Sequence, residues 1–180
     1  MNWAVFGVLG YLLLALSYAG GPLLSVWGVR PEPLMILVVY VALMAQWRAA
    51  MSAALVGGLC LDLLTLYPGG IVLVGPHTLG MLMGAFVVHQ LRNVVFRHSL
   101  LTVVILTGVG GLFAEIFTTA LLVLRTLPWP VGETIPGWSP ADALFGGFLS
   151  VLYTALLALP VGALLLAGER WFGFAERVQR

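Results

Sequence analysis

Two acidic residues, Asp62 and Glu115, lie within long apolar runs of this 180-residue sequence. A charged side chain at the centre of a bilayer costs about 2.5–3.5 kcal/mol on insertion scales, so an acid in such a run is a candidate proton or solute site. A carboxyl group in an apolar run can instead hydrogen-bond to neighbouring helices, which is a structural role. These are the two chemistries that the pattern allows.

Each acid belongs to a stripe of small and polar residues at helical spacing. The stripes are Ala54, Gly58, Asp62 and Thr65; Gly108, Gly111, Glu115 and Thr118; and His77, Gly80 and Gly84. Small residues let helix backbones approach closely, and polar groups hydrogen-bond across such contacts. At a rise of about 1.5 Å per residue, both acids fall in the outer half of a membrane. The polar cavity and its helix packing are therefore expected at Asp62, Glu115, Gly58, His77, Gly84 and Thr118.

The structural role is the favoured interpretation of Asp62. No basic residue lies at the same depth, and no second acid on the same predicted helix supplies a proton relay. A transport site normally uses such paired groups. A packing role needs only hydrogen bonds to neighbouring helices and to the turn that follows Asp62, so it fits the sequence better.

No enzyme motif accompanies these acids. The sequence has no HExxH, no nucleophile elbow and no glycine-rich loop followed by lysine. The histidines, His77, His89 and His98, are scattered over separate sites, and the single cysteine, Cys60, excludes an intramolecular disulfide. We therefore predict a protein that is not an enzyme and that uses no cofactor and no metal.

The composition predicts a membrane protein. Hydrophobic residues make up 61% of the chain and charged residues only 8%, against about 25% charged residues in soluble domains. About 20 apolar residues are needed for a helix to cross a bilayer core. We predict one all-α membrane domain, residues 1–180, with spans near 3–24, 31–47, 49–66, 77–91, 99–126 and 141–167. The first span lacks the basic flank of a cleavable signal peptide, so we expect it to stay.

The arginines predict how these spans are oriented. One side holds Arg48, Arg92, Arg97, Arg170, Arg177 and Arg180; the other holds Arg30 and Arg125 with the acids Glu32, Glu133 and Asp142. Basic residues gather on the cytoplasmic side of membrane proteins, so both termini are predicted to be cytoplasmic. The tail, residues 168–180, is expected to form a short interfacial helix, with a frayed basic tail as the alternative.

Three segments resemble a known family. They are RPEPLMILVVYVAL, ALVGGLCLDLLTLYPGG and GPHTLGMLMGAF, and together they cover about residues 30–90. They resemble the MreD family of rod shape-determining membrane proteins. The matching positions are Arg30, Pro31, Tyr40, Gly57, Gly58, Asp62, Leu63, Gly75, His77, Leu79 and Gly84. One departure is the connector YPGGIVLV, which is longer than the family's usual turn and argues against a direct contact between Asp62 and His77.

The resemblance implies a fold and a role. The fold is a six-helix bundle similar to the substrate-binding subunits of energy-coupling-factor transporters. The role is a non-catalytic scaffold in the bacterial inner (cytoplasmic) membrane, which binds MreC and helps to control peptidoglycan synthesis and rod shape. Possible further partners are RodA, the transpeptidase PBP2 and the MreB filament, besides membrane lipid; no nucleic acid is implied.

Two surfaces and two alternative functions complete the expectations. Arg92 and Arg97 are expected to line a cytoplasmic loop that meets MreB or anionic lipid. Small residues on the first helix, Gly7, Gly10, Ala15 and Ala19, offer a docking surface for a partner helix.

The first alternative is a small-solute-binding subunit of an energy-coupled transporter, which needs aromatic and polar groups that converge near the outer face. The second is a proton-coupled carrier, which needs acids with access from both sides.

Overall fold

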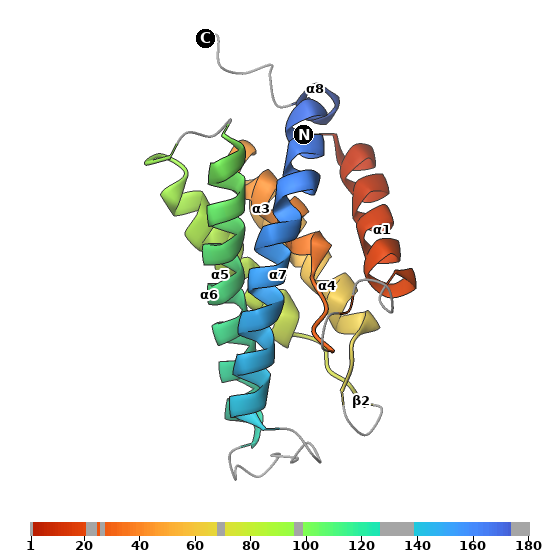
Figure 1. Cartoon of the computed structure of the whole chain (residues 1–180), viewed down its shortest axis with the longest axis vertical. Coiled ribbons are helices and arrows are strands. Elements are labelled where there is room, and N and C mark those ends of the chain that lie inside the picture. Colours follow the sequence, from red (N-terminus) through yellow and green to blue (C-terminus); the bar gives the residue numbers. More distant parts are fainter. Residues whose placement is uncertain are drawn as a thin grey trace.

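The computed structural model describes residues 2–20, 25, 28–67, 71–95, 99–126 and 139–173, and it is built from helices (Figure 1). Six of them have at least 12 residues: α1 Trp3–Ala19, α3 Pro33–Met44, α4 Trp47–Leu64, α5 Pro76–Leu91, α6 Leu100–Thr126 and α7 Pro140–Ala167. The short helix α8 spans Glu169–Phe172. Each long helix falls on one of the predicted apolar segments, so the all-α class is confirmed.

A short β-hairpin with two residues in each strand is the exception that the sequence did not predict. Strands β1 Leu66–Tyr67 and β2 Ile71–Val72 pair antiparallel, with Leu66 opposite Val72. The hairpin follows α4 directly and precedes α5. The predicted third span ended at residue 66, but α4 ends at Leu64 and the chain becomes extended from Thr65.

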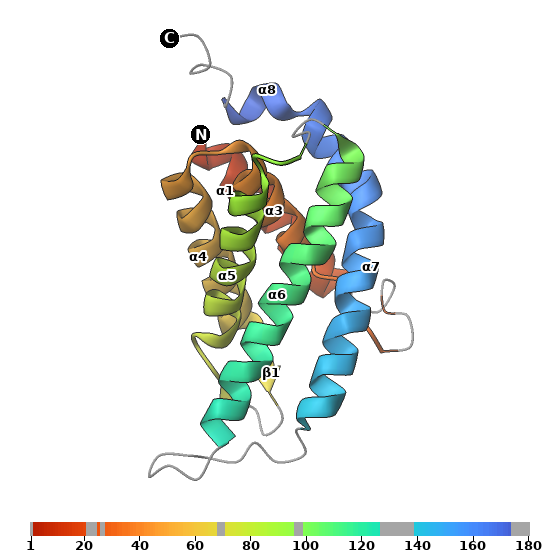
Figure 2. The same ribbon diagram turned by 90° about the vertical axis from the view of Figure 1, so that its left-hand side faces the viewer.

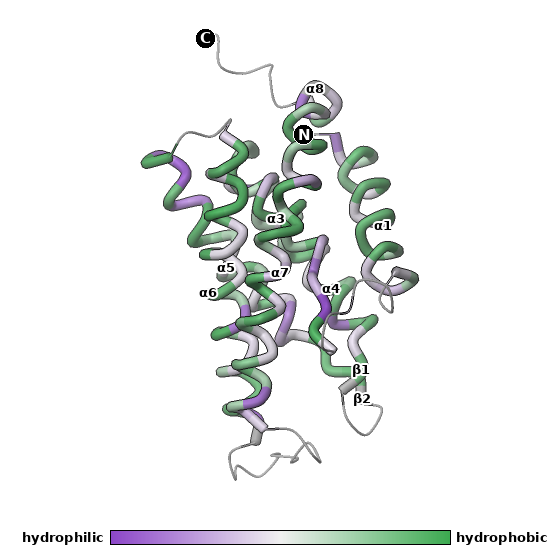
Figure 3. Tube along the Cα trace, in the orientation of Figure 1, coloured by the Kyte–Doolittle hydropathy of each residue, from purple (hydrophilic) through white to green (hydrophobic). Residues whose placement is uncertain are grey.

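Within the described residues, three helices are long and apolar enough to cross a membrane: α4, α6 over Leu100–Arg125, and α7. Helices α1 and α3 are apolar but shorter, and most of the helical length is hydrophobic (Figure 3). Large apolar side chains face outward on the long helices; Leu101, Leu124 and Leu164 are 64%, 63% and 73% exposed. In water such a surface would be unfavourable, so it indicates association with a membrane.

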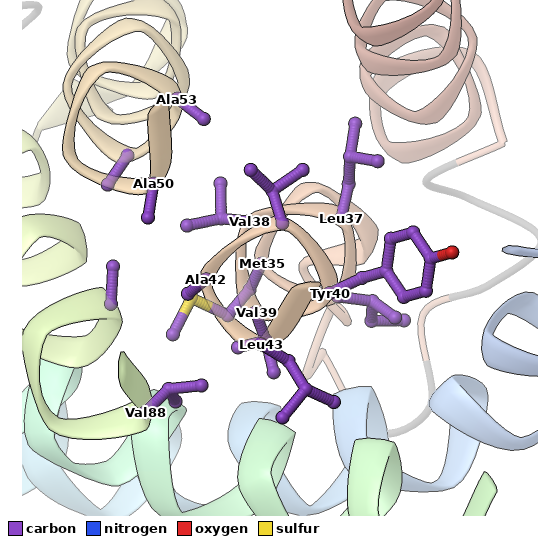
Figure 4. Packing of buried hydrophobic residues seen from close by; sticks show 14 of the residues in the cluster. Met35, Leu37, Val38, Val39, Tyr40, Ala42, Leu43, Ala50, Ala53 and Val88 are labelled. Carbon is purple, nitrogen blue, oxygen red and sulfur yellow. The ribbon is translucent and has the colours of Figure 1, made fainter. Parts of the chain in front are cut away.

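Helix α3 is the centre of the bundle, and it is buried on every side. No side chain from Leu34 to Leu43 is more than 3% exposed. Its neighbours are α1, α4, α5, α6 and α7, and its side chains point outward among them in all directions (Figure 4). A helix that is hydrophobic all round must be surrounded by other apolar elements, which explains why this segment shows no polar face.

The shortness of α3 places its first turn inside the molecule. Twelve residues make a helix of about 18 Å, well below the bilayer core of about 30 Å. Figure 2 shows α3 starting at a level about midway along α7. The chain therefore approaches α3 part-way along the bundle: Pro31 is buried and Glu32 half-buried, while Arg30 is still exposed.

Helices α4, α5, α6 and α7 pack side by side in chain order around α3. Glycines allow the closest of these contacts. A Cβ atom at Gly84 of α5 would lie 2.6 Å from the Gly110 carbonyl oxygen of α6, and one at Gly80 would collide with the Thr118 hydroxyl. The predicted stripe of His77, Gly80 and Gly84 therefore packs directly on α6, which corresponds to the predicted span 99–126.

The two ends of the described chain meet at one end of the bundle (Figure 1). The Asn2 amide donates to the Phe172 carbonyl oxygen at 2.9 Å. The Phe172 ring is only 1% exposed and packs edge-on against Tyr40, with ring centroids 5.4 Å apart. Helix α8 thus closes this end over α3. Residues 174–180 of the predicted interfacial tail lie outside the described residues.

Substitution of glycine by alanine tests the α5–α6 contact. Gly84→Ala should destabilise the protein by about 1–3 kcal/mol, because an added methyl group overpacks a rigid backbone contact. Gly146→Ala is the matched control, since a Cβ atom there has nothing within 4 Å. Thermal unfolding in detergent micelles measures both. Equal melting temperatures for the two variants would contradict the close packing.

Candidate functional site

The carboxyl group of Asp62 is fully buried at the end of α4 and accepts four hydrogen bonds. Its Oδ2 accepts from the backbone amides of Gly75 at 2.7 Å and Thr78 at 3.0 Å, and also from the Thr78 hydroxyl. Its Oδ1 accepts from the His77 amide at 2.9 Å. All four partners are donors, which is the pattern that an acceptor-only carboxylate requires.

Asp62 acts as the N-terminal cap of a helix to which it does not belong. The first amides of any helix lack partners within that helix, and α5 has no side-chain cap of its own because Gly75 stands at the cap position. Gly75 has φ +127°, a conformation that favours glycine. A negative charge at this end also interacts favourably with the helix dipole. The structural interpretation of Asp62 therefore fits its surroundings.

The contact between Asp62 and His77 that the long connector argued against is present. It runs through the His77 backbone amide. The β1–β2 hairpin absorbs the extra residues of the connector and returns the chain to the end of α4. Gly58 completes this joint, because a Cβ atom there would collide with the Thr78 backbone and lie 3.0 Å from the His77 carbonyl oxygen.

A second polar feature is a cavity of about 20 Å³ between α3, α5, α6 and α7, large enough for about one water molecule. Its polar lining consists of Glu32, His77, Thr107, Glu115, Thr118, Ser150 and Thr154. Its apolar lining consists of Met35, Met81, Gly111, Ala114 and Val151. Seven polar side chains around so small a space mark this cavity as the candidate site.

Helix packing positions the two acids of the cavity. Glu115 projects from α6 toward α7, where Gly147 leaves room for it: a Cβ atom at that position would lie 2.8 Å from the Glu115 Oε2 atom. Glu32 precedes α3, and its backbone amide donates to the Thr154 hydroxyl of α7 at 2.8 Å. The Thr118 hydroxyl donates to the Pro76 carbonyl oxygen at 3.1 Å, which fixes α6 against the start of α5.

The expectation that Asp62 and Glu115 share one cavity is wrong. Asp62 does not line the cavity, because the first turn of α5 lies between the two acids and takes up the Asp62 carboxylate. His77 connects the Asp62 joint with the cavity. Its backbone amide donates to the Asp62 carboxylate, and His77 is also one of the residues that line the cavity. Thr118 lines the cavity with them, as expected, whereas Gly58 and Gly84 serve helix packing.

Glu32, Thr107, Ser150 and Thr154 are site residues that sequence reasoning missed. Two of them carried a usable signal, since Ser150 and Thr154 are four residues apart and continue a small-residue stripe along α7. That stripe comprises Gly147, Ser150, Thr154, Ala158 and Gly162. Glu32 was placed at the outer end of the short span predicted at 31–47, on the same side as Arg30. Only the short, central α3 brings it inside.

The remaining family-motif positions have varied surroundings. Pro31 and Tyr40 are buried. A Cβ atom at Gly57 would touch Val38 of α3 at 3.2 Å, whereas Leu63 is 62% exposed. The Arg30 carbonyl oxygen accepts a hydrogen bond from the Ser150 hydroxyl at 2.6 Å. Apart from Leu63, these positions belong to the packed core around α3 and the segment that leads into it.

Arg92 differs from its expected role as a loop residue facing outward. It is partly buried, and its guanidinium Nη1 donates to the Ala45 carbonyl oxygen after the end of α3. His89 Nδ1 lies 3.1 Å from the Ala42 carbonyl oxygen. Basic groups at a helix C-terminus bind its free carbonyls and interact favourably with its dipole. Arg92 therefore caps α3, and Arg97 lies outside the described residues.

A wider groove of about 380 Å³ adjoins the cavity. It lies between the end of α1, the segment before α3 and the end of α4, and its lining includes Tyr18, Arg30, Leu61 and Leu64. Glu32 lines both the groove and the cavity. The groove thus ends at the wall of the candidate site.

Comparison of the chain with protein families, with curated proteins and with solved structures finds no match. Among the residues that the structure describes, no group of three His, Cys, Asp or Glu side chains is placed to hold a metal ion. The site offers the side chains of two acids and four hydroxyl residues around a small space, together with one imidazole.

Substitution of Asp62 tests its role as a cap. Asp62→Asn should cost about 1–3 kcal/mol, because one acceptor oxygen is replaced by an amide donor that faces other donors. Asp62→Leu should cost more, since it leaves every donor of the joint without a partner. Asp142→Asn, at an exposed position near the start of α7, is the control. Wild-type melting temperatures for both Asp62 variants would refute the cap.

Proposed function

We propose that this chain crosses the bacterial cytoplasmic membrane six times, with both ends in the cytoplasm. It acts there as a non-catalytic scaffold subunit of the cell-wall elongation complex, as the resemblance to the MreD family implies. The observation that carries the proposal is the joint at Asp62. Residues of the resembling motif that are distant in sequence, among them Gly58, Gly75 and His77, meet there around one carboxylate. Motif residues that fix how helices pack together are expected in a protein that acts as a scaffold.

The six crossings combine the three long apolar helices with α1, α3 and α5. Helix α3 is too short to match a bilayer alone, but its sides contact protein instead of lipid. Length matching applies to surfaces that face lipid, so a short central helix is compatible with this topology. The proposed fold is similar to the substrate-binding subunits of energy-coupling-factor transporters.

The size of the polar cavity favours the scaffold over solute binding. Pockets for small molecules usually measure about 300–1,000 Å³ and are rich in aromatic side chains. The cavity measures about 20 Å³, and its lining has no aromatic ring apart from the His77 imidazole. One observation supports the transporter subunit as a second candidate, because the adjoining groove of about 380 Å³ has the volume of a ligand site.

Helix α1 offers the best surface for a partner's membrane helix. Among the described elements it packs mainly on α3 and α8, and Val8, Tyr11 and Leu12 are 60%, 72% and 54% exposed. Gly10 of the expected small-residue patch faces Leu34 and Leu37 instead, while Gly7 has nothing within 4 Å. We propose that the membrane helix of MreC docks against this outward face. RodA, PBP2 and MreB then join through MreC.

Co-purification from the native host tests the scaffold. The tagged full-length chain should recover MreC together with wall-synthesis proteins, and Tyr11→Ala should lower the recovery of MreC several-fold because it removes the most exposed ring of α1. Phe145→Ala is the matched control, since Phe145 is a 67% exposed ring on α7. Recovery of an ATPase module without wall-synthesis proteins would refute the scaffold and favour the transporter subunit.

A further inference from the structure

The groove of about 380 Å³ lies in the side of the bundle, where α1 and α4 end. Helices α1 and α4 both pack on α3 but make little contact with each other, and α1 stands at the edge of the bundle (Figure 1). The groove occupies the gap that remains between them. Its described lining consists of Ser17, Tyr18, Arg30, Pro31, Glu32, Leu34, Leu61, Leu64, Thr65 and Leu66.

The groove has a buried apolar floor and an open side. Leu34 and Leu61 form part of the floor and are almost completely buried, whereas Tyr18, Leu64 and Leu66 are 43%, 46% and 71% exposed. Pockets for small molecules usually enclose about 70–90% of the surface of their ligand. A groove with such an exposed rim instead suits a molecule that stays partly in the bilayer, which is the situation of a lipid.

Two opposite charges line this groove. Arg30 and Glu32 are separated by one residue in the segment before α3. Within the described residues Arg30 forms no ion pair, and the hydrogen bond that it makes uses its backbone carbonyl oxygen. Charged side chains at membrane depth normally pair with a group of opposite charge. An occupant with one anionic and one cationic group would satisfy both residues.

Helix α1 places the groove near a membrane boundary. Its 17 residues make a helix of about 25 Å, close to the bilayer core of about 30 Å. Trp3, at the start of α1, is exposed, and exposed tryptophans gather at membrane–water boundaries. Ser17 and Tyr18, at the other end of α1, therefore approach the opposite boundary. Because they line the same groove as Arg30, Arg30 lies close to the level of the phospholipid headgroups.

We propose that the groove binds one phospholipid whose headgroup carries a primary ammonium, as in phosphatidylethanolamine. The Arg30 guanidinium binds the phosphate, because its planar set of donors matches phosphate oxygens. The Glu32 carboxylate accepts hydrogen bonds from the ammonium group. An acyl chain runs over Leu34 and Leu61 between α1 and α4, and the lipid thereby holds α1 against α4. This proposal rests on the membrane association of the chain and not on the scaffold.

The pair of charges distinguishes this lipid from other occupants of the groove. A partner's membrane helix presents mainly apolar side chains, which would bury Arg30 and Glu32 without partners at a cost in free energy. An anionic phospholipid would pair with Arg30 but bring a further negative charge toward Glu32. Phosphatidylcholine has both charges, but its trimethylated nitrogen has no hydrogen to donate to Glu32. Phosphatidylethanolamine supplies both the anion and the cationic donor.

The test uses the purified full-length chain in detergent, after removal of the lipid that purifies with it. Native mass spectrometry compares phosphatidylethanolamine, phosphatidylcholine and phosphatidylglycerol with identical acyl chains at equal concentrations. One phosphatidylethanolamine should bind per chain, at least several-fold more tightly than either of the other lipids. It should also raise the melting temperature with a saturable concentration dependence, because a ligand that binds only the folded state stabilises it.

Three variants assign the binding to the groove. Arg30→Gln should weaken the binding of all three lipids at least several-fold, because each of them carries a phosphate. Glu32→Gln should retain binding but lose the preference for phosphatidylethanolamine. Since Arg30 is exposed, its substitution should leave folding intact, and Arg30→Gln decides the proposal even if Glu32→Gln folds poorly. Arg125→Gln is the matched control and should bind as the wild type does, since Arg125 is an exposed arginine at the end of α6, outside the groove lining.

Three results would overturn the lipid site. They are equal binding of the three lipids by the wild type, a preference for phosphatidylcholine or phosphatidylglycerol, and unchanged binding of phosphatidylethanolamine by Arg30→Gln. No partner protein takes part in this experiment, so failure of the lipid site would leave the recovery of MreC by the tagged chain unaffected.

Discussion

The organisation of this bundle depends on the hydrogen bonds between the Asp62 carboxylate and the first turn of α5. Away from water, the free amides at the start of a helix must find acceptors within the protein. Asp62 supplies them from the end of α4, across a connector that the β1–β2 hairpin shortens in space. This joint fixes where α5 begins. It therefore also fixes the position of His77 and the register of the glycines that pack on α6.

The second constraint is the burial of α3. Because this helix is apolar on all sides, the other long helices surround it and leave no face toward lipid. Because it is also short, the chain enters it from within the bundle. Glu32 then lies beside Glu115, and the polar cavity forms at the level where α3 begins. Arg92 and His89 close the opposite end of the helix by binding its last carbonyls.

The two acids found first in the sequence turn out to have different chemistry. Asp62 is surrounded by donors, and its bonding capacity is used within the protein. Glu115 faces a space lined with acceptors and with a second acid. A carboxylate whose oxygens all accept hydrogen bonds from the protein has a structural role, whereas Glu115 shares its cavity with the second acid Glu32 and with His77. Helical spacing alone made the two look equivalent.

The sequence by itself determined the helices and the closely packed stripes. Apolar runs between polar breaks located all six long helices, because each run must be buried or face lipid. The spacing of Gly58, Gly80 and Gly84 indicated close helix contacts, because small residues permit them. Only the tertiary structure decided which polar groups meet. The hairpin brought Asp62 to Gly75, and the short α3 carried Glu32 into the interior. Neither contact is visible in the sequence, because each depends on how far along the bundle axis a segment lies. The periodicity of apolar residues along one helix carries no information about the position of that helix relative to another.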